Sequence, residues 1–204
     1  HMLKPIFLLT LLWIAFTPAL FAADEVKLID PKPITPGHQV IPLFPSGHPA
    51  LKALAGADKE EIFTPGKDGH VAKVNNIHVP TIELYLAPAD KANGISVILS
   101  PGGGNKDLWV GPEGVEVANW LNTLGVSCFV HRYRLQPYGS ATDALAETQR
   151  AVRVIRAHAK EWNIDPHKIG HMGFSAGGEQ TARLALTYDQ GDPSAADPID
   201  KVSS

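Results

Sequence analysis

The stretch Lys168-Ile-Gly-His-Met-Gly-Phe-Ser-Ala-Gly-Gly-Glu179 decides the fold of this chain. It begins as a short apolar strand, reaches Gly173-Phe-Ser-Ala-Gly177, and continues directly into a helical pattern over Glu179–Leu186. A G-x-S-x-G motif between a strand and a helix is typical of a nucleophile elbow, a sharp turn that exposes the serine hydroxyl at the edge of a sheet. The alternative is a glycine-rich turn in which the serine only caps the helix.

The two glycines that flank Ser175, at 173 and 177, have a steric purpose in the elbow interpretation. Strand and helix approach each other closely there, and glycine has no Cβ that would collide. The following helix directs its free N–H groups and its dipole toward the serine, which favours a developing negative charge. We therefore expect Ser175 to adopt a strained backbone conformation.

The composition is that of one ordinary globular domain. The 204 residues suffice for a core, 44% of them are hydrophobic, and the formal net charge is −3 without long runs of charge. This balance argues against a nucleic-acid partner. The only cysteine, Cys128, lies in an apolar run, so we expect no disulfide framework, no metal site of the thiol type and no cofactor.

The N-terminal segment is predicted to direct export. His1-Met2 resembles the remnant of a cloning site. Residues 3–23 have the plan of a secretory signal peptide, with Lys4 before an apolar run that ends in Ala22-Ala23. A membrane anchor and an ordinary buried helix are the alternatives, although Pro18 interrupts the run. The sequence therefore predicts a secreted or periplasmic protein.

Residues 24–70 are predicted to form a proline-rich extended arm or linker. Six prolines between Asp30 and Ala50 leave almost no hydrophobic periodicity, so the arm need not belong to the core. Its histidines, His38 and His48, stand ten residues apart without partners at useful ligand spacing. We therefore expect no metal site there.

Residues 71–204 alternate predicted strands and helices. The expected strands are the elbow strand together with Val71–Val79, Thr81–Ala87, Ile95–Leu99 and Val126–Tyr133. This order predicts an α/β domain with a mostly parallel sheet, helices on both of its faces, and an antiparallel hairpin formed by its first two strands.

Two helices precede the elbow. Pro112 opens the first and Gly125 ends it, and one face of this helix carries a set of apolar side chains, namely Val117, Trp120, Leu121 and Leu124. The second begins with a capping box, Ser140-Ala-Thr-Asp143, and is expected to end near Asn163.

Two glycine-rich turns, residues 102–104 and 173–178, each follow the carboxyl end of a predicted strand. Ligands of such sheets bind at the carboxyl ends of the strands. We therefore expect both turns to face one crevice, although about seventy residues separate them.

These residues resemble the α/β-hydrolase superfamily, and most closely its hormone-sensitive-lipase-like esterases and acetyl-xylan-esterase-like carbohydrate esterases. Three motifs carry the resemblance in the same order: Pro101-Gly-Gly-Gly104, Tyr133-Arg-Leu-Gln-Pro137, and Trp162-Asn-Ile-Asp-Pro166 followed by Gly173–Gly178. The phenylalanine before the serine is typical of the carbohydrate esterases. Where the lipase loop has a histidine this chain has proline, so only backbone donation carries over.

The resemblance implies that Ser175 is the nucleophile that forms an acyl-enzyme. It also implies that backbone N–H groups of Gly103, Gly104 and Ala176 hold the oxyanion, without a metal. Tyr133 and its neighbour Arg134 are expected to support the site rather than to react.

The serine of this fold is followed in the chain by an acid and then a histidine, yet no histidine follows Ser175. The later aspartates lie in a stretch that is predicted to be a surface loop, and the upstream histidines (His131, His158, His167 and His171) are interpreted as structural. We therefore expect the acid, the histidine and the C-terminal strands of the fold to be absent from this chain, which alone would be nearly inactive. A C-terminal complementing segment, or self-association, would cover the open edge of the sheet.

Two functions stay open on this basis. The first is a secreted serine carboxylic-ester hydrolase that removes acetyl or other ester groups from plant-type carbohydrate, with a small-molecule or carbohydrate ester as its partner. The second is a non-catalytic α/β-hydrolase-like binding protein, or an inactive fragment, that keeps the elbow.

Overall fold

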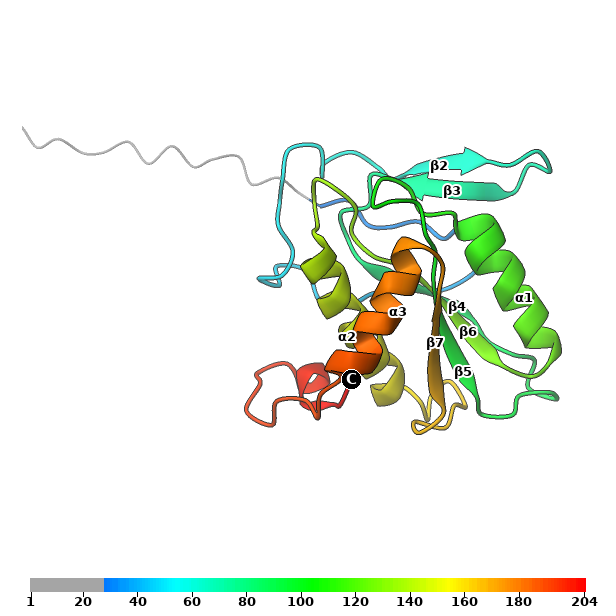
Figure 1. The fold of residues 1–204 in the computed structure, drawn as a ribbon. Coiled ribbons are helices and arrows are strands. Elements are labelled where there is room, and N and C mark those ends of the chain that lie inside the picture. The colour runs from blue at the N-terminus through cyan, green and yellow to red at the C-terminus, as the bar shows by residue number, and fades with distance from the viewer. Residues whose placement is uncertain (1–27) are drawn as a thin grey trace, which may run out of the picture.

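The computed structural model describes residues 28–204, drawn in colour in Figure 1. The expected cloning remnant and signal peptide therefore lie outside the described residues. Within the part that is described, every helix is too short or too polar to cross a membrane.

A five-stranded sheet in the order β1-β4-β6-β5-β7 forms the centre. β4 runs antiparallel to both of its neighbours, whereas β5 is parallel to both β6 and β7, so that only β4 opposes the other four strands. The predicted mostly parallel sheet is thereby confirmed. The strands are β1 (Val40–Pro42), β4 (Thr81–Tyr85), β5 (Ser96–Ser100), β6 (Ser127–Arg132) and β7 (Ile169–Gly173).

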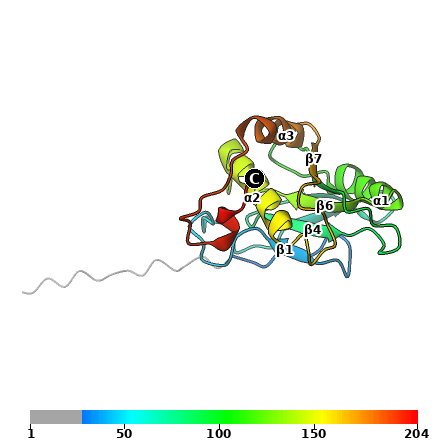
Figure 2. The same cartoon turned by 90° about the horizontal axis from the view of Figure 1, so that it is seen from below.

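Helices cover both faces of the sheet, as the two views in Figures 1 and 2 show. One face carries α1 (Glu116–Thr123), which a π-helical turn over Gly111–Val115 precedes. The other face carries α2 (Ala141–Ala157) and α3 (Ala176–Thr187). A short 3-10 turn, η2 (Pro198–Lys201), lies against α2.

The core consists of two hydrophobic layers, one on each face of the sheet. The central strand β6 is buried along its whole length. Cys128 and Val130 contribute to the layer under α1, and Phe129 between them packs against Trp162 in the layer under α2 and α3. This alternation is what a strand that is covered on both faces requires.

The predicted capping box of α2 is confirmed, because Ser140 and Asp143 each accept a hydrogen bond from the backbone N–H of the other. The helix ends at Ala157, six residues earlier than predicted. His158 leaves the helical conformation and stacks on Trp162, so the residues up to Asn163 form turns instead of another helical turn.

The predicted hairpin between the strands at 71 and 81 is wrong. β3 (Val71–Asn75) pairs with β2 (Ile62–Pro65) in a separate two-stranded sheet, and β4 pairs with β1 and β6. Asn76, with a φ of 58°, turns the chain away from β3. The residues between the two strands remain largely buried, so hydrophobicity alone did not reveal the break.

The segment interpreted as an arm contributes to the core. It supplies the edge strand β1 and the buried side chains of Ile34, Leu43 and Phe44. Glu83 of β4 fixes its path, because this fully buried carboxylate accepts hydrogen bonds from the backbone N–H groups of Ile34 (2.6 Å) and Thr35 (2.9 Å). Prolines interrupt the periodicity of the segment without preventing this burial.

The predicted apolar face of α1 is only partly correct. Leu121 is buried, whereas Trp120 and Leu124 are 60% and 55% exposed. The π-helical turn before α1 alters which side of the helix faces the sheet. Ala118 points inward as a result.

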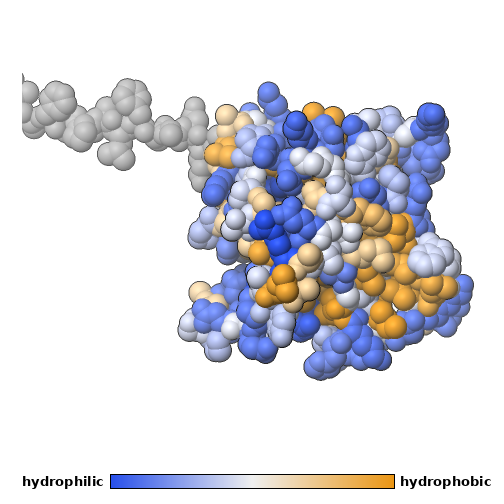
Figure 3. Space-filling model, in the orientation of Figure 1, coloured by the Kyte–Doolittle hydropathy of each residue, from blue (hydrophilic) through white to orange (hydrophobic). Residues whose placement is uncertain are grey.

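β7 forms one edge of the sheet, since it pairs only with β5. Met172 on this strand is 39% exposed, and Figure 3 shows hydrophobic surface beside β7 on the face that carries α1. The structure therefore leaves both the edge of β7 and part of one face of the sheet uncovered by residues 28–204.

Glu83→Ala tests the attachment of the N-terminal segment. The substitution leaves two N–H groups without their acceptor, and each unsatisfied buried group costs about 1–3 kcal/mol. We expect a large loss in the free energy of unfolding, measured by urea denaturation. Glu60→Ala is the control, because the side chain of Glu60 forms an exposed ion pair with Lys32, and such pairs contribute at most about 1 kcal/mol. Equal effects of the two substitutions would contradict this account.

Candidate active site

Ser175 stands between β7 and α3 with φ 49° and ψ −115°, so the predicted strained conformation is confirmed. Non-glycine residues in such regions cost about 1–3 kcal/mol and persist where surrounding structure imposes them. The residue is exposed, and α3 begins directly after it at Ala176. The serine hydroxyl is thus accessible at the N-terminus of a twelve-residue helix.

The glycines on either side of Ser175 impose this conformation. A Cβ at Gly173 would collide with the carbonyl oxygen of Gly177, and a Cβ at Gly177 would collide with the carbonyl oxygen of Ser100 at the end of β5. The strand, the first turn of the helix and the neighbouring strand therefore meet at distances that only glycine permits.

The glycine-rich loop after β5 lies against this turn. A Cβ on Gly102 would stand 2.9 Å from Cβ of Ser175 and 2.6 Å from the carbonyl oxygen of Phe174. Gly103 and Gly104 follow with φ of 142° and 62°, conformations that favour glycine. The contact confirms that the two glycine-rich turns lie side by side at the carboxyl ends of β5 and β7.

Several hydrogen bonds hold the loop, among them three from groups outside it. Glu113 accepts a hydrogen bond from the N–H of Gly102 (2.7 Å), Tyr133 donates its hydroxyl to the carbonyl oxygen of Pro101 (2.8 Å), and the N–H of Gln136 donates to the carbonyl oxygen of Asn105 (3.2 Å). The supporting role expected of Tyr133 agrees with its contact.

The bond to Glu113 occupies the N–H of Gly102. The N–H groups of Gly103 and Gly104, in contrast, donate to no atom of residues 28–204. Ala176 is the first residue of α3, so its N–H has no intrahelical partner either. The three predicted donors therefore remain available to a ligand.

Arg134, the residue after Tyr133, links three parts of the domain. Its side chain forms a buried ion pair with Glu147 of α2, whose other carboxylate oxygen accepts the backbone N–H of Arg134 (2.8 Å). The same guanidinium donates to the carbonyl oxygen of Ala50 (2.7 Å). These contacts join the segment after β6 to α2 and to the N-terminal segment.

A chain of four polar side chains lies inside the domain, along the strands that lead to the elbow. Ser100 Oγ is 3.1 Å from His131 Nδ1 and 3.0 Å from His171 Nε2, and His171 Nδ1 is 2.8 Å from Thr181 Oγ1. Thr181 donates its own proton to the carbonyl oxygen of Gly177 (3.2 Å). The chain therefore joins β6, β5 and β7 to the first turns of α3.

The hydrogen bond that Thr181 donates to Gly177 fixes the direction of the others. Because Thr181 donates onward, its oxygen accepts from His171 Nδ1–H, which leaves His171 Nε2 as the acceptor for the hydroxyl of Ser100. Ser100 Oγ in turn accepts from His131 Nδ1–H. His171 thus carries its proton on Nδ1 and must be neutral for the chain to be complete, whereas Nε2 of His131 is buried without a partner within residues 28–204.

Burial enforces this neutral state. It lowers the pKa of His131 to about 3, with a further lowering by His171, and it lowers the pKa of His171 to about 4. Both nitrogens of His171 are engaged, and Ser175 Oγ has no hydrogen-bond partner within residues 28–204. Neither histidine is placed to accept the proton of Ser175.

Three of the four aspartates after α3 pair with arginines of α2 instead of approaching the serine, and the fourth, Asp192, accepts hydrogen bonds from Ser194. Asp189 is 2.6 Å from Arg153 and follows the C-terminus of α3, whose twelve residues span about 18 Å. The predicted surface loop that carries these aspartates is irregular up to Asp197, but Asp200 lies in the short 3-10 turn η2.

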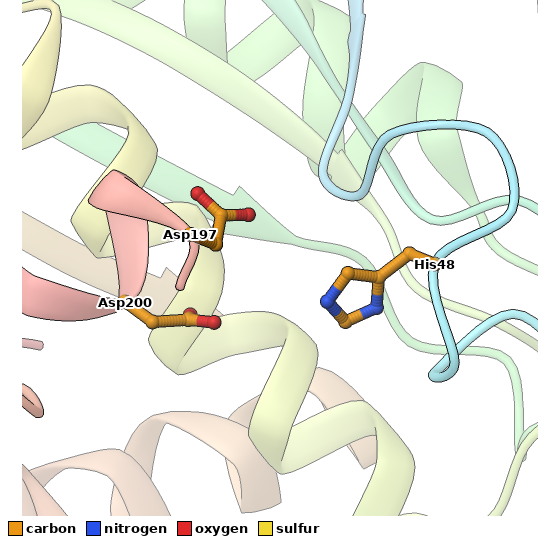
Figure 4. A group of neighbouring side chains, drawn as sticks. All are labelled: His48, Asp197 and Asp200. Carbon is orange, nitrogen blue, oxygen red and sulfur yellow. The ribbon is translucent and has the colours of Figure 1, made fainter. Parts of the chain in front are cut away.

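His48, Asp197 and Asp200 form the group in the described chain that could hold a metal ion, with one ligand atom of each lying within 4.8 Å of the others. Figure 4 shows the imidazole opposite the two carboxylates, which lie too far from His48 in the sequence for spacing to reveal them. Arg150 already pairs with both carboxylates, at 2.5 Å from Asp197 and 2.7 Å from Asp200. These side chains therefore connect the N-terminal segment with α2 and η2.

Sequence reasoning missed two groups that build the site. Glu113 appeared only as part of a helix, and Ser100 only as the residue before a glycine-rich loop. The position of Ser100 at the end of a strand, next to that loop, was a usable signal. The pairing with His131 and His171 was not, because it depends on the order of strands in the sheet.

The sheet, the elbow and the glycine-rich loop together define a protein of the α/β-hydrolase type. The BD-FAE family matches residues 82–199, more than half of the chain, and the chain belongs to that family. An esterase of Thermogutta terrifontis shares the fold, with a TM-score of 0.56 at 20% identity over 88% of this chain and 55% of the other.

Two relatives are similar in sequence as well. An acetylxylan esterase of Xylanibacter ruminicola is 40% identical over 96 residues, which are 47% of this chain and 20% of that protein. The crystal structure of an acetyl ester-xyloside bifunctional hydrolase from Caldicellulosiruptor lactoaceticus superposes with a TM-score of 0.63 at 32% identity. That match covers 81% of this chain and 53% of the other. The chain thus spans between a fifth and about half of these relatives.

The neutral histidines predict a pH dependence of stability. The pKa of His171 falls from 6.5 to about 4 on folding, so the unfolded chain binds more protons between these values. The contribution of neutral His171 to the free energy of unfolding is complete above pH 6.5 and is lost as the pH falls toward 4. Burial raises the pKa of Glu61 to about 7, which acts in the opposite direction, so the test must compare two proteins.

We therefore expect the stability difference between the natural sequence and His171→Gln to shrink as the pH falls from about 7 to about 4.5, by up to about 1.4 kcal/mol per pH unit. Urea denaturation at each pH measures this. Gly170→Ala on the same strand, where the nearest atom to the new methyl group is 3.7 Å away, should give a difference that does not change with pH. A constant difference for His171→Gln would refute the proposed protonation states.

Proposed function

We propose that this chain carries the nucleophile and the oxyanion site of a serine carboxylic-ester hydrolase. Ser175 Oγ attacks the ester carbonyl carbon, its proton passes to a base, and the alcohol leaves with a proton from that base, so that an acyl-enzyme remains for water to hydrolyse. The strained and exposed Ser175 beside the glycine-rich loop is the observation that carries this proposal.

The N–H groups of Gly103, Gly104 and Ala176 are the oxyanion donors in this proposal. Their freedom from other hydrogen bonds within residues 28–204 supports the assignment, since the neighbouring N–H of Gly102 is occupied by Glu113. Each such donor contributes on the order of 3 kcal/mol to the stabilisation of the transition state. The helix dipole of α3 acts in the same direction.

The base and its acid are proposed to come from polypeptide other than residues 28–204. Two observations support this: Ser175 has no partner among the described histidines, and the chain spans 53% of the Caldicellulosiruptor lactoaceticus enzyme. The uncovered edge of β7 is where a completing segment, or a second copy of the chain, would pair.

The substrate is proposed to be an ester of a carbohydrate, with acetyl as the acyl group. The support is the character of the relatives, one of which is an acetylxylan esterase and another a hydrolase of acetyl esters and xylosides. Polysaccharides that carry such esters are too large to enter cells, which suits the export signal that residues 3–23 suggest.

We propose accordingly that the protein is secreted or periplasmic. Mass spectrometry of the protein from an expressing cell should show a mature N-terminus near Ala23 or Asp24 in the exported fraction. An intact segment of residues 3–23 on protein that stays with the membrane would contradict a cleaved signal and favour an anchor.

The catalytic proposal is tested with p-nitrophenyl acetate. The 204-residue chain should hydrolyse it slowly at best, because loss of triad members leaves only about 10³–10⁴-fold acceleration over water. A longer polypeptide that supplies the histidine should be much faster, and Ser175→Ala in it should remove that gain. A suitable control is Ser194→Ala in the loop after α3, which should leave the rate unchanged because Ser194 bonds only within that loop, to Asp192. Fast turnover that survives Ser175→Ala would overturn the proposal.

A further inference from the structure

Trp109 presents an aromatic ring at the surface beside the glycine-rich loop. The residue is 43% exposed, although Leu108 before it and Val110 after it are completely buried. Leu108 exchanges two backbone hydrogen bonds with Val74 of β3, at 3.0 and 2.8 Å, so the chain is extended there. Successive side chains of an extended chain point to opposite sides, which turns Trp109 outward.

The backbone of Trp109 is fixed close to Ser175. Its N–H donates to the carbonyl oxygen of Gly102 at 3.0 Å, and Gly102 is the residue that lies against Cβ of Ser175. A single residue, Gly102, therefore separates the backbone of Trp109 from the elbow.

Polar groups surround the ring on the side of β3. Lys73 Nζ lies 5.3 Å from the ring centroid and 3.5 Å from a carboxylate oxygen of Asp107, and Asn75 donates to the other oxygen at 3.3 Å. The cation lies over the indole, and the carboxylate holds the cation there. They also supply a charged donor and an acceptor at its margin.

A pyranose ring matches this arrangement, because it offers a face of C–H groups and a rim of hydroxyls. Exposed indole takes such an apolar face, while an ammonium and a carboxylate beside it can bind hydroxyls. An aryl or short alkyl alcohol would use only the indole and would make no contact through hydroxyls with the ammonium and the carboxylate.

We propose that Trp109 is the stacking platform for a sugar ring of the alcohol part of the substrate, in a chain of β-linked xylose residues whose acyl group reaches Ser175. This inference rests on the proposed esterase function and specifies its substrate side. Trp109 positions the carbohydrate and takes no part in the bond changes.

Trp120 provides a matched control. It is also an exposed tryptophan, at 60%, but it lies on α1, eleven residues further along the chain and roughly 15 Å along the helical segment. Both residues can be replaced without opening the core. A comparison of the two variants therefore distinguishes a role of Trp109 beside the loop from a general effect of removing an exposed indole.

The experiment measures binding without hydrolysis. Xylohexaose is titrated calorimetrically into the full 204-residue chain, and mobility is compared in gels with and without soluble xylan. We expect saturable binding that Trp109→Ala weakens at least about tenfold, that Trp109→Phe partly retains, and that Trp120→Ala changes by less than about twofold. Near-UV circular dichroism and the thermal midpoint verify that each variant is folded.

Three results would overturn the inference: no binding by the natural sequence, equal binding by Trp109→Ala, or an equal loss with Trp120→Ala. Failure of the sugar platform can be told apart from failure of the proposed esterase function. Ser175→Ala should bind xylohexaose normally, so the platform is established or refuted even if no ester is hydrolysed. Ser175-dependent hydrolysis with unaltered binding by Trp109→Ala would leave the esterase proposal standing and refute the platform alone.

Discussion

The first turn of α3 comes so close to the end of β5 that a single methyl group at Gly177 would collide with the carbonyl oxygen of Ser100. This approach bends the chain at Ser175, exposes its side chain and brings the loop after β5 against the elbow. The hydrogen bond from the N–H of Phe174 to the same carbonyl oxygen (3.1 Å) secures the contact. The conformation of the serine is therefore a consequence of packing between two elements and not of its own preference.

The order of the elements and the elbow could be predicted because both are local in the sequence. A strand, a G-x-S-x-G motif and a helix follow one another within residues 168–186, and the capping box of α2 lies within four residues. The environment of β3 and of the N-terminal segment could not be predicted in this way. Glu83 binds the backbone at Ile34 across 49 positions, and no periodicity in either segment records that contact.

In the site, too, some residues could be predicted from the sequence and others could not. Ser175 and the glycine-rich loop are visible as motifs, whereas Glu113 acts through one hydrogen bond that depends on how the π-helical turn before α1 sits over the loop. The outward orientation of Trp109 likewise follows from the pairing of Leu108 with Val74. Residues that position a site are harder to find than residues that carry its motif, since their chemistry is expressed only through the tertiary structure.

The four side chains from His131 to Thr181 form a line in which every donor points the same way. Substitution of one of these residues alone is destabilising, because reversing a single donor leaves two acceptors or two protons facing each other inside the protein. Replacement of all four by apolar side chains avoids that conflict. Across the family these positions should therefore change together, and their covariation would trace the line through sequences whose structures are unknown.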